Sequence, residues 1–186
     1  MISVAYEVGR YRRLLAETVG NGDTVVEIGP HRASSTDLYV GKAGKAVLVD
    51  KGADAAGALR EYADRHRNVI FICGDARSFD TVALALQHAE SCDVLAVDLG
   101  GGRYPDTVFK VWAIWSGVFK PRDSVIRCRG LAEFLRRAQV RDDTLPETFK
   151  DNGWLSEYGR AVPSKLKEQL DEFKNWVDVD KQQEDI

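Results

Sequence analysis

The chain has 186 residues, of which 44% are hydrophobic and 30% are charged, and its formal net charge is −3 at pH 7. This balance predicts one globular domain with a short appendage. No apolar run is long enough to span a membrane, and the first residues lack the basic and apolar regions of a signal peptide. We therefore expect a cytoplasmic protein without a membrane contact.

The first expected element is a helix over residues 3–19, because apolar side chains recur there with helical spacing (Val4, Val8, Tyr11, Leu14, Leu15 and Val19). Asn21-Gly22 ends it. The β-branched run 24–28 predicts a strand that enters a turn at Gly29. Ser34, Ser35 and Thr36 follow, and they are expected to cap a second helix.

From residue 45 onward, short apolar runs alternate with helical patterns. Strands are expected over 45–50, 68–73, 93–99 and 124–128. Helices are expected over 53–66, 79–90, 107–119 and 131–140, with Trp112 and Trp115 in the core or at an interface rather than at a substrate. Near-continuous apolar strands are usually buried on both faces of a parallel sheet. The pattern therefore predicts an α/β fold with a doubly wound, mostly parallel, Rossmann-like sheet and helices on both of its faces.

The pattern changes after Val140. Residues 141–163 are polar, whereas Leu166, Leu170, Phe173 and Val177 recur with helical spacing. We expect a domain over residues 1–140, and over 141–186 a polar loop with a C-terminal helix (165–177) packed on the domain or on a partner. Charge is also divided: residues 121–141 carry six Arg and two acids (+4), and residues 171–186 carry six acids and two Lys (−4).

Three cysteines, Cys73, Cys92 and Cys128, are odd in number and widely spaced. Cys73 and Cys128 lie at apolar strand-like runs and have no His near them in the sequence. This arrangement favours reduced thiols in the core over a disulfide or a metal site. No metal site is expected.

Acidic residues stand at or just after the ends of four expected strands, namely Glu27, Asp50, Asp75 and Asp98. In an open parallel sheet, the ligand crevice lies outside the carboxyl ends of the strands. Carboxylates there can accept hydrogen bonds from ribose hydroxyls, an exocyclic amine or an ammonium group. A single acid would reflect only the preference of Asp for turns, but four in succession predict a ligand site.

Four short motifs carry a family resemblance: Val25-Val-Glu-Ile-Gly29, Val47-Leu-Val-Asp50, Cys73-Gly-Asp-Ala76 and Asp93-Val-Leu-Ala-Val-Asp98. In their order and spacing they resemble the successive motifs of class I S-adenosylmethionine-dependent methyltransferases, over residues 20 to 140. The resemblance implies a seven-stranded Rossmann-like sheet with a mixed edge and S-adenosylmethionine as cofactor.

The resemblance also implies roles for individual residues. Glu27 would orient the methionine ammonium group, directly or through water, and Gly29 would let the backbone approach the ligand. Asp50 would bind both ribose hydroxyls, and Asp75 would accept from the adenine amine. Asp98 would lie near the methyl group as the catalytic candidate. Lys51 and Ala76 stand beside these acids and complete the expected cofactor site together with Pro30 and His31.

Two features depart from the family. Its loops usually carry further glycines, whereas Pro30 and His31 follow Gly29 here, and His31 either contacts the cofactor or points into solvent. Such a loop suits a pyrophosphate poorly. S-adenosylmethionine has no phosphate, so one tight glycine can be enough. The family also closes its sheet with an antiparallel hairpin, which is not evident after Val140, so that its edge strands are missing or replaced by the 165–177 helix.

The methyl acceptor is not identified by the sequence. Arg127 and Arg129 could bind a phosphate, and Tyr104 could stack on a planar substrate or fill the surface of the core. Arg122, Arg136 and Arg137 belong to the same Arg-rich segment (122–141), which favours RNA as the acceptor, although a solvated helix face explains it as well. The alternative to an active methyltransferase is a non-catalytic binding or regulatory protein of the same fold. A homodimer is compatible with either.

Overall fold

Six short β-branched or apolar runs form one sheet in the computed structural model, which describes residues 1–101, 104–146 and 148–155. The strands are β1 (Ile2–Ala5), β2 (Thr24–Ile28), β3 (Lys45–Asp50), β4 (Val69–Cys73), β5 (Val94–Asp98) and β6 (Asp123–Arg127). The helices are α1 (Val8–Thr18), the 3₁₀ turn η1 (Thr36–Leu38), α2 (Ala53–Arg65), α3 (Phe79–His88), α4 (Pro105–Phe119) and α5 (Arg129–Arg137).

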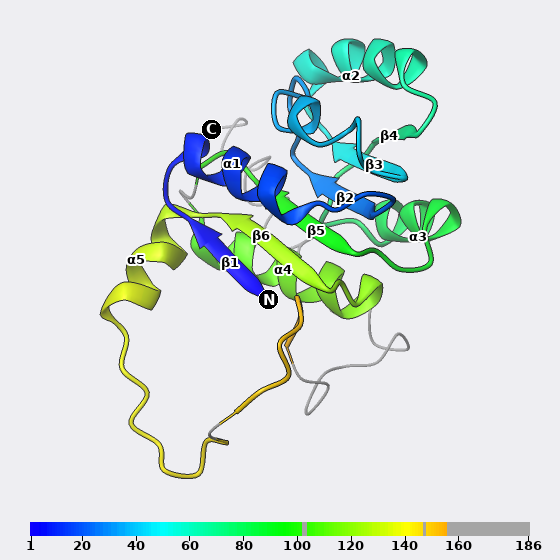
Figure 1. The fold of residues 1–186 in the computed structure, drawn as a ribbon. Coiled ribbons are helices and arrows are strands. Elements are labelled where there is room, and N and C mark those ends of the chain that lie inside the picture. The colour runs from blue at the N-terminus through cyan, green and yellow to red at the C-terminus, as the bar shows by residue number, and fades with distance from the viewer. Residues whose placement is uncertain (102–103, 147, 156–186) are drawn as a thin grey trace, which may run out of the picture.

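The strands lie side by side in the order β1-β6-β5-β2-β3-β4, and every pairing is parallel (Figure 1). From β2 the chain builds outward through β3 and β4, and then returns to the other side of β2 to place β5 and β6. The direction of winding therefore reverses between β2 and β5. In such sheets this switch point opens a crevice outside the carboxyl ends of the two strands. The expected doubly wound α/β fold is confirmed.

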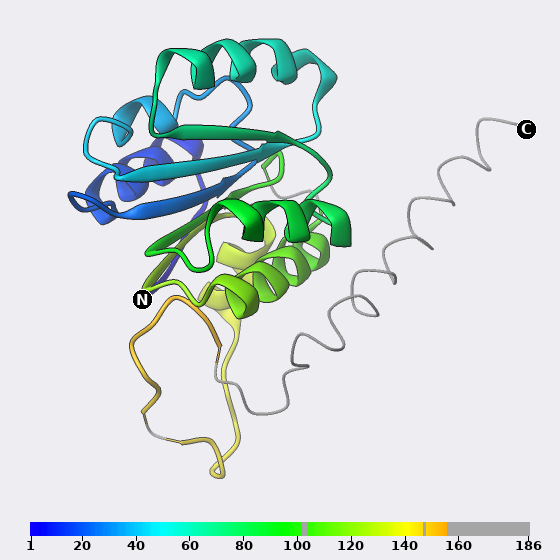
Figure 2. The same cartoon turned by 90° about the vertical axis from the view of Figure 1, so that its right-hand side faces the viewer.

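Helices cover both faces of the sheet, with α1 and α2 on one side and α3 and α4 on the other (Figures 1 and 2). The core consists accordingly of two apolar layers. Trp112 and Trp115 are buried in the layer under α4, as expected. Their indole N–H groups donate to Ser124 Oγ (2.9 Å) and to the Ala76 carbonyl (2.7 Å). Each large side chain is therefore buried without leaving an unpaired donor.

The N-terminal segment differs from the expectation of one helix over residues 3–19. Residues 2–5 form β1, which pairs with β6 along Ile2↔Ser124 to Ala5↔Arg127, and the helix begins only at Val8. Four residues are too few for a period-2 pattern to stand out from a helical one. Within the described residues the sheet is wholly parallel, so the mixed edge implied by the resemblance is not found there. Residues 165–177 lie outside the described part of the chain.

The cysteines follow the expectation in two cases of three. Cys92 and Cys128 are buried free thiols, whereas Cys73 is exposed. Cys73 is the last residue of β4, and β4 forms the edge of the sheet as far as the chain is described. The expectation that Cys73 belongs to the core was therefore wrong. Among the described residues, no helix combines the length and apolar character needed to cross a membrane.

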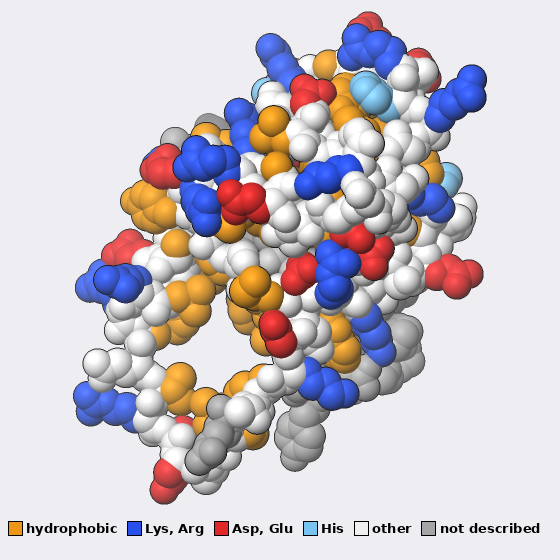
Figure 3. Space-filling model, in the orientation of Figure 1, with side chains coloured by type: hydrophobic (Ala, Val, Ile, Leu, Met, Phe, Trp, Pro, Cys, Tyr) orange, Lys and Arg blue, Asp and Glu red, His pale blue; other side chains and the backbone are white. Residues whose placement is uncertain are grey.

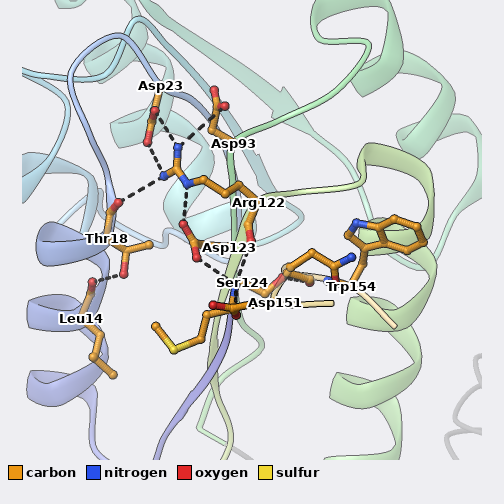
Figure 4. Close-up of polar contacts among 12 residues, drawn as sticks. Leu14, Thr18, Asp23, Asp93, Arg122, Asp123, Ser124, Asp151 and Trp154 are labelled. Carbon is orange, nitrogen blue, oxygen red and sulfur yellow. Dashed lines mark hydrogen bonds and ion pairs between the residues drawn. The ribbon is translucent and has the colours of Figure 1, made fainter. Parts of the chain in front are cut away.

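A charged cluster closes the amino edge of the sheet, opposite the expected ligand edge (Figure 4). The Arg122 guanidinium donates to Asp23 (2.9 Å) and to Asp123 (2.7 Å), and it lies 3.9 Å from Asp93. It thereby ties the approach to β2 to the starts of β5 and β6. Arg122 therefore lies at the opposite edge of the sheet from Arg127, and the Arg-rich segment does not form one continuous surface.

We expect Arg122→Ala to lower the free energy of unfolding by about 1–2 kcal/mol at neutral pH, because the Asp23 carboxylate loses its charged partner. The hydrogen bond from Arg122 lowers the pKa of Asp23, against the effect of its partial burial. Its stabilisation is therefore present above the unfolded pKa and lost as the pH falls through the lowered folded pKa. Urea unfolding between pH 7 and pH 2.5 measures this.

Arg10→Ala, which removes the exposed 3.7 Å pair with Glu17, is the matched control and should change stability by less than about 0.5 kcal/mol. Equal losses in both variants would contradict the prediction.

Candidate functional site

The four expected acids lie at the carboxyl edge of the sheet. Glu27 is the fourth residue of β2, Asp50 and Asp98 end β3 and β5, and Asp75 follows the end of β4 by two residues. Three of these strands are neighbours in the order β5-β2-β3, and β4 lies outside β3. The acids therefore share one rim that spans the switch point between β2 and β5. Their environments differ, and these differences decide what each can bind.

Glu27 is fully buried, and its carboxylate is held by three hydroxyl groups. Thr36 Oγ1 and Tyr39 Oη each donate to Oε2 at 2.7 Å, and Ser35 Oγ donates to Oε1. Burial raises the pKa of Glu27, and these hydrogen bonds act in the opposite direction. A carboxylate offers about four acceptor sites, so three donors leave the hydrogen-bonding capacity of Oε1 only partly used.

The hydroxyl groups explain why the expected helix after Ser34 is missing. Ser35 and Thr36 do not cap a helix with their side chains, and only the short turn η1 forms. Their hydroxyls satisfy the buried carboxylate instead, because an unpaired carboxylate in the core would cost far more than a missing helix cap. Sequence reasoning missed Ser35, Thr36 and Tyr39 as partners of Glu27, and the cluster of hydroxyl side chains eight to twelve residues later was the available signal.

In the loop after β2, the backbone is left-handed at Gly29 and also at two residues that are not glycine. Gly29, His31 and Ala33 all have positive φ angles, of 78°, 54° and 59°. Side chains disfavour this region, so the loop must be held in place by its surroundings. A Cβ on Gly29 would lie 1.9 Å from the carbonyl oxygen of Asp98. The crowding that requires glycine therefore comes from the neighbouring strand β5. Pro30 lies between Gly29 and His31 in this loop.

Asp50 connects the loops after β2 and β3. Its two carboxylate oxygens accept from the backbone N–H groups of Gly52 (2.8 Å) and His31 (3.0 Å). About half of its acceptor sites therefore remain for a ligand. The His31 ring lies 3.4 Å from the exposed Asp54 carboxylate. His31 thus contributes its backbone to this edge of the sheet.

Asp75 is held by cations. Arg77 Nη2 lies 2.7 Å and Lys51 Nζ 3.3 Å from Asp75 Oδ2, and the backbone N–H of Arg77 donates to Oδ1 at 2.9 Å. Partial burial opposes ionisation, but these contacts prevail and lower the pKa of Asp75 to about 2. Ala76 is buried, and its carbonyl is occupied by the Trp115 indole. Asp75 is therefore ionised, and an amine group of a ligand would have to compete with Arg77 for its carboxylate oxygens.

Asp98 and Arg127 form a second ion pair, across the adjacent strands β5 and β6. They are register partners, and Arg127 Nη1 donates to both carboxylate oxygens at 3.0 and 2.9 Å. Their side chains are only 13% and 17% exposed. Among the described residues, Arg127 Nε and the Tyr11 hydroxyl are buried without a hydrogen-bond partner. Native structures seldom leave such atoms unpaired, so both are candidates for contacts with a ligand or a water molecule.

Tyr11 belongs to this rim, although sequence reasoning placed it only in a helix. Side chains alternate along a strand, so Glu27, Asp98 and Arg127 share the sheet face of Val25, Ala96 and Val125. Val25, Ala96 and Val125 lie on the face of the sheet that α1 covers, and Tyr11 is a residue of α1 that packs there.

Aromatic and basic side chains stand next to this pair at the same edge. Tyr104 precedes α4 and is 67% exposed. Arg129 begins α5, lies 5.2 Å over the exposed ring of Tyr6 and forms a 3.0 Å ion pair with Glu7. Tyr6 was not expected here, because residues 3–19 were interpreted as one helix. Tyr6 and Tyr104 can both offer a ring face to a planar group.

The chain was compared with known proteins in three ways. No protein-family model and no curated protein matches it. The solved structures of similar fold include the 23S rRNA methyltransferase ErmE (16% identity, TM-score 0.48, 68% of this chain and 48% of that chain). They also include YcgJ of Bacillus subtilis (14%, 0.48, 62% and 47%) and Aeropyrum pernix fibrillarin with natively bound S-adenosyl-L-methionine (19%, 0.46, 61% and 50%). The chain thus spans about half the length of these proteins, and the function proposed below rests on its own residues.

We expect Glu27→Ala to lower the free energy of unfolding by about 2–4 kcal/mol, because three hydroxyls lose their acceptor and a cavity is left. Glu27→Gln keeps an acceptor oxygen and should lose clearly less. The folded state holds the Glu27 proton more tightly than the unfolded state, since the folded pKa is raised. The natural chain should therefore lose stability relative to Glu27→Gln as the pH rises through the raised pKa. Urea unfolding at several pH values tests both points: an alanine variant as stable as the natural chain would refute the first, and a stability difference between the natural chain and Glu27→Gln that does not change with pH would refute the second.

Proposed function

We propose that the chain binds S-adenosylmethionine at the carboxyl edge of the sheet and transfers its methyl group to a nucleophilic acceptor. The observation that carries this proposal is the convergence of Asp50, Asp98 and the glycine-conformation loop at the switch point between β2 and β5. This is the position at which open α/β sheets bind their ligands. The rim presents carboxylates, which suit hydroxyl and ammonium groups better than a pyrophosphate.

The residues present fit such a cofactor. Asp50 would accept from the ribose hydroxyls with the acceptor sites that Gly52 and His31 leave open. Glu27 would hold the loop through its hydroxyl contacts and face the ammonium group, directly or through water. The buried Tyr11 hydroxyl and Arg127 Nε, which lack partners among the described residues, would donate to the methionine carboxylate. Asp75 and Ala76 would flank the adenine, with Lys51 beside Asp75.

Bound S-adenosylmethionine supplies an electrophilic methyl group on a sulfonium, so that transfer depends mainly on alignment of the acceptor. In our proposal Asp98 is the catalytic residue that orients the acceptor nucleophile by accepting its hydrogen bond. The two bonds from Arg127 fix the position of the Asp98 carboxylate. Arg127 itself stays protonated and cannot act as the base.

RNA is the acceptor class that the surrounding side chains favour. Arg129 would bind a phosphate, and the exposed rings of Tyr6 and Tyr104 would stack on bases. Arg122 is excluded from this role, because it lies in the charged cluster at the amino edge. The proposed contact surface is therefore smaller than the whole Arg-rich segment.

Calorimetric titration with S-adenosylmethionine tests cofactor binding. We expect binding by the natural chain and an affinity at least about tenfold weaker for Asp50→Asn, because one charged acceptor for the ribose hydroxyls is lost. Asp64→Asn, on the exposed side of α2, is the matched control and should bind like the natural chain. Absence of heat at millimolar ligand with a folded protein would refute the proposal.

A non-catalytic binding protein is the second candidate, and the ion pairing of Asp98 favours it, because both carboxylate oxygens are already occupied by Arg127. Transfer of a labelled methyl group to RNA, protein and small-molecule fractions of a cell extract separates the two. An active enzyme should label one fraction, RNA first, and Asp98→Ala should lower the label at least about 100-fold if Asp98 orients the nucleophile. Cofactor binding without any labelled fraction would support the second candidate.

A further inference from the structure

Helix α5 exposes most of an apolar stripe. Leu131, Phe134, Leu135 and Ala138 recur at the spacing that places side chains on one helix face. Leu131 packs against the core, whereas Phe134 and Leu135 are 64% and 60% exposed. No residue of α5 is fully buried. The stripe is therefore anchored on the domain at its first turn and uncovered beyond it.

A hollow lies along this stripe. It has a volume of about 420 Å³ and is lined by Gly130, Glu133, Phe134, Arg137 and Ala138. Figure 3 shows hydrophobic side chains around the opening between α5, the segment that follows it and the sheet. The following segment adds exposed apolar side chains of its own, Val140, Leu145 and Phe149. Apolar surface gathered in this way marks a docking site.

The chain itself contains a segment of matching chemistry. Leu166, Leu170, Phe173 and Val177 would present a second apolar stripe if residues 165–177 were helical. Residues 129–141 carry four Arg and one acid (+3), residues 165–177 carry three Lys and three acids, and the residues that follow, 178–186, carry four acids and one Lys (−3). An apolar seam with opposite charges along its borders is the usual pattern of two packed amphipathic helices.

The connection is long enough for the segment to reach α5. The Gly153 N–H donates to the Pro121 carbonyl next to the start of β6, and α5 begins two residues after the end of that strand. The five residues of β6 span about 17 Å, whereas the ten residues from Leu155 to Lys165 span up to about 33 Å. A tether of this length gives a local concentration in the millimolar range.

We propose that residues 165–177 dock on the apolar stripe of α5 in the same molecule and fill the hollow beside Phe134. The docked segment covers the bare part of the stripe, and the acidic residues that follow it, 178–186, come near the basic end of α5. The segment is thereby part of the folded domain. This proposal does not depend on the nature of the ligand at the carboxyl edge.

Hydrogen–deuterium exchange of the full chain, read peptide by peptide, tests the docking. We expect amides of residues 165–177 to exchange at least about tenfold more slowly than unprotected amides, and Phe134→Asp to remove that protection. The reciprocal change Leu170→Asp should release residues 131–138 and leave the sheet protected. Leu84→Asp, at an exposed position on α3, is the matched control and should leave both segments unchanged.

Unprotected exchange of 165–177 in the natural chain would overturn the proposal, and so would protection that survives Phe134→Asp. Light scattering over a range of protein concentrations shows whether a second copy of the chain, rather than residues 165–177 of the same molecule, covers the stripe. A constant monomer mass with unchanged protection supports docking within one molecule. If instead the protection appears only at protein concentrations at which a dimer forms, a second copy of the chain covers the stripe, and docking within one molecule is overturned.

Discussion

The carboxyl edge of this sheet depends on one buried carboxylate. Glu27 lies in the core beside the switch point, and the Ser35, Thr36 and Tyr39 hydroxyls converge on it from the loop that returns over the sheet. An uncompensated carboxylate in this position would cost several kcal/mol, so that loop and strand must stay together. The left-handed conformations at His31 and Ala33 can persist because that contact holds them. The Asp50 contact to the His31 N–H adds a second fixed point.

This arrangement has a consequence for the chemistry of the rim. Four acids along one edge would repel one another and raise each other's pKa if they stood alone. The chain separates them into different environments: hydroxyls surround Glu27, Arg77 and Lys51 hold Asp75, and Arg127 holds Asp98. Within the described part of the chain, Asp50 is held by backbone N–H groups alone. It is consequently the rim carboxylate most readily available to a ligand's hydroxyl groups, whereas the others act mainly by fixing the shape around it.

Much of this could be predicted from the sequence, because local patterns determine it. The β-branched runs 24–28 and 45–50 gave strands with the expected ends, and the spacing of the acids placed Asp50 and Asp98 at the ends of their strands. The features that could not be predicted from the sequence depend on contacts between residues that are far apart in the chain. Ser35 and Thr36 follow the local rule for helix caps, and only the burial of Glu27 overrides it. The pairing of Asp98 with Arg127 requires β5 and β6 to be neighbours in a particular register, which no local motif encodes.

The two ends of the Arg-rich segment illustrate why charge along a sequence is a weak guide to a surface. Residues 122 and 127 are five apart, yet they lie at opposite edges of the sheet because β6 runs between them. Arg122 and Arg127 are both paired with acids, so neither contributes a free charge. On α5, Arg129 and Arg137 are in turn paired with Glu7 and Glu133, so the net positive charge beside the apolar stripe is smaller than the number of Arg residues suggests. The exposed apolar side chains of that face, Phe134 and Leu135, suit an amphipathic segment better than a phosphate backbone alone, because a phosphate gains nothing from contact with apolar groups.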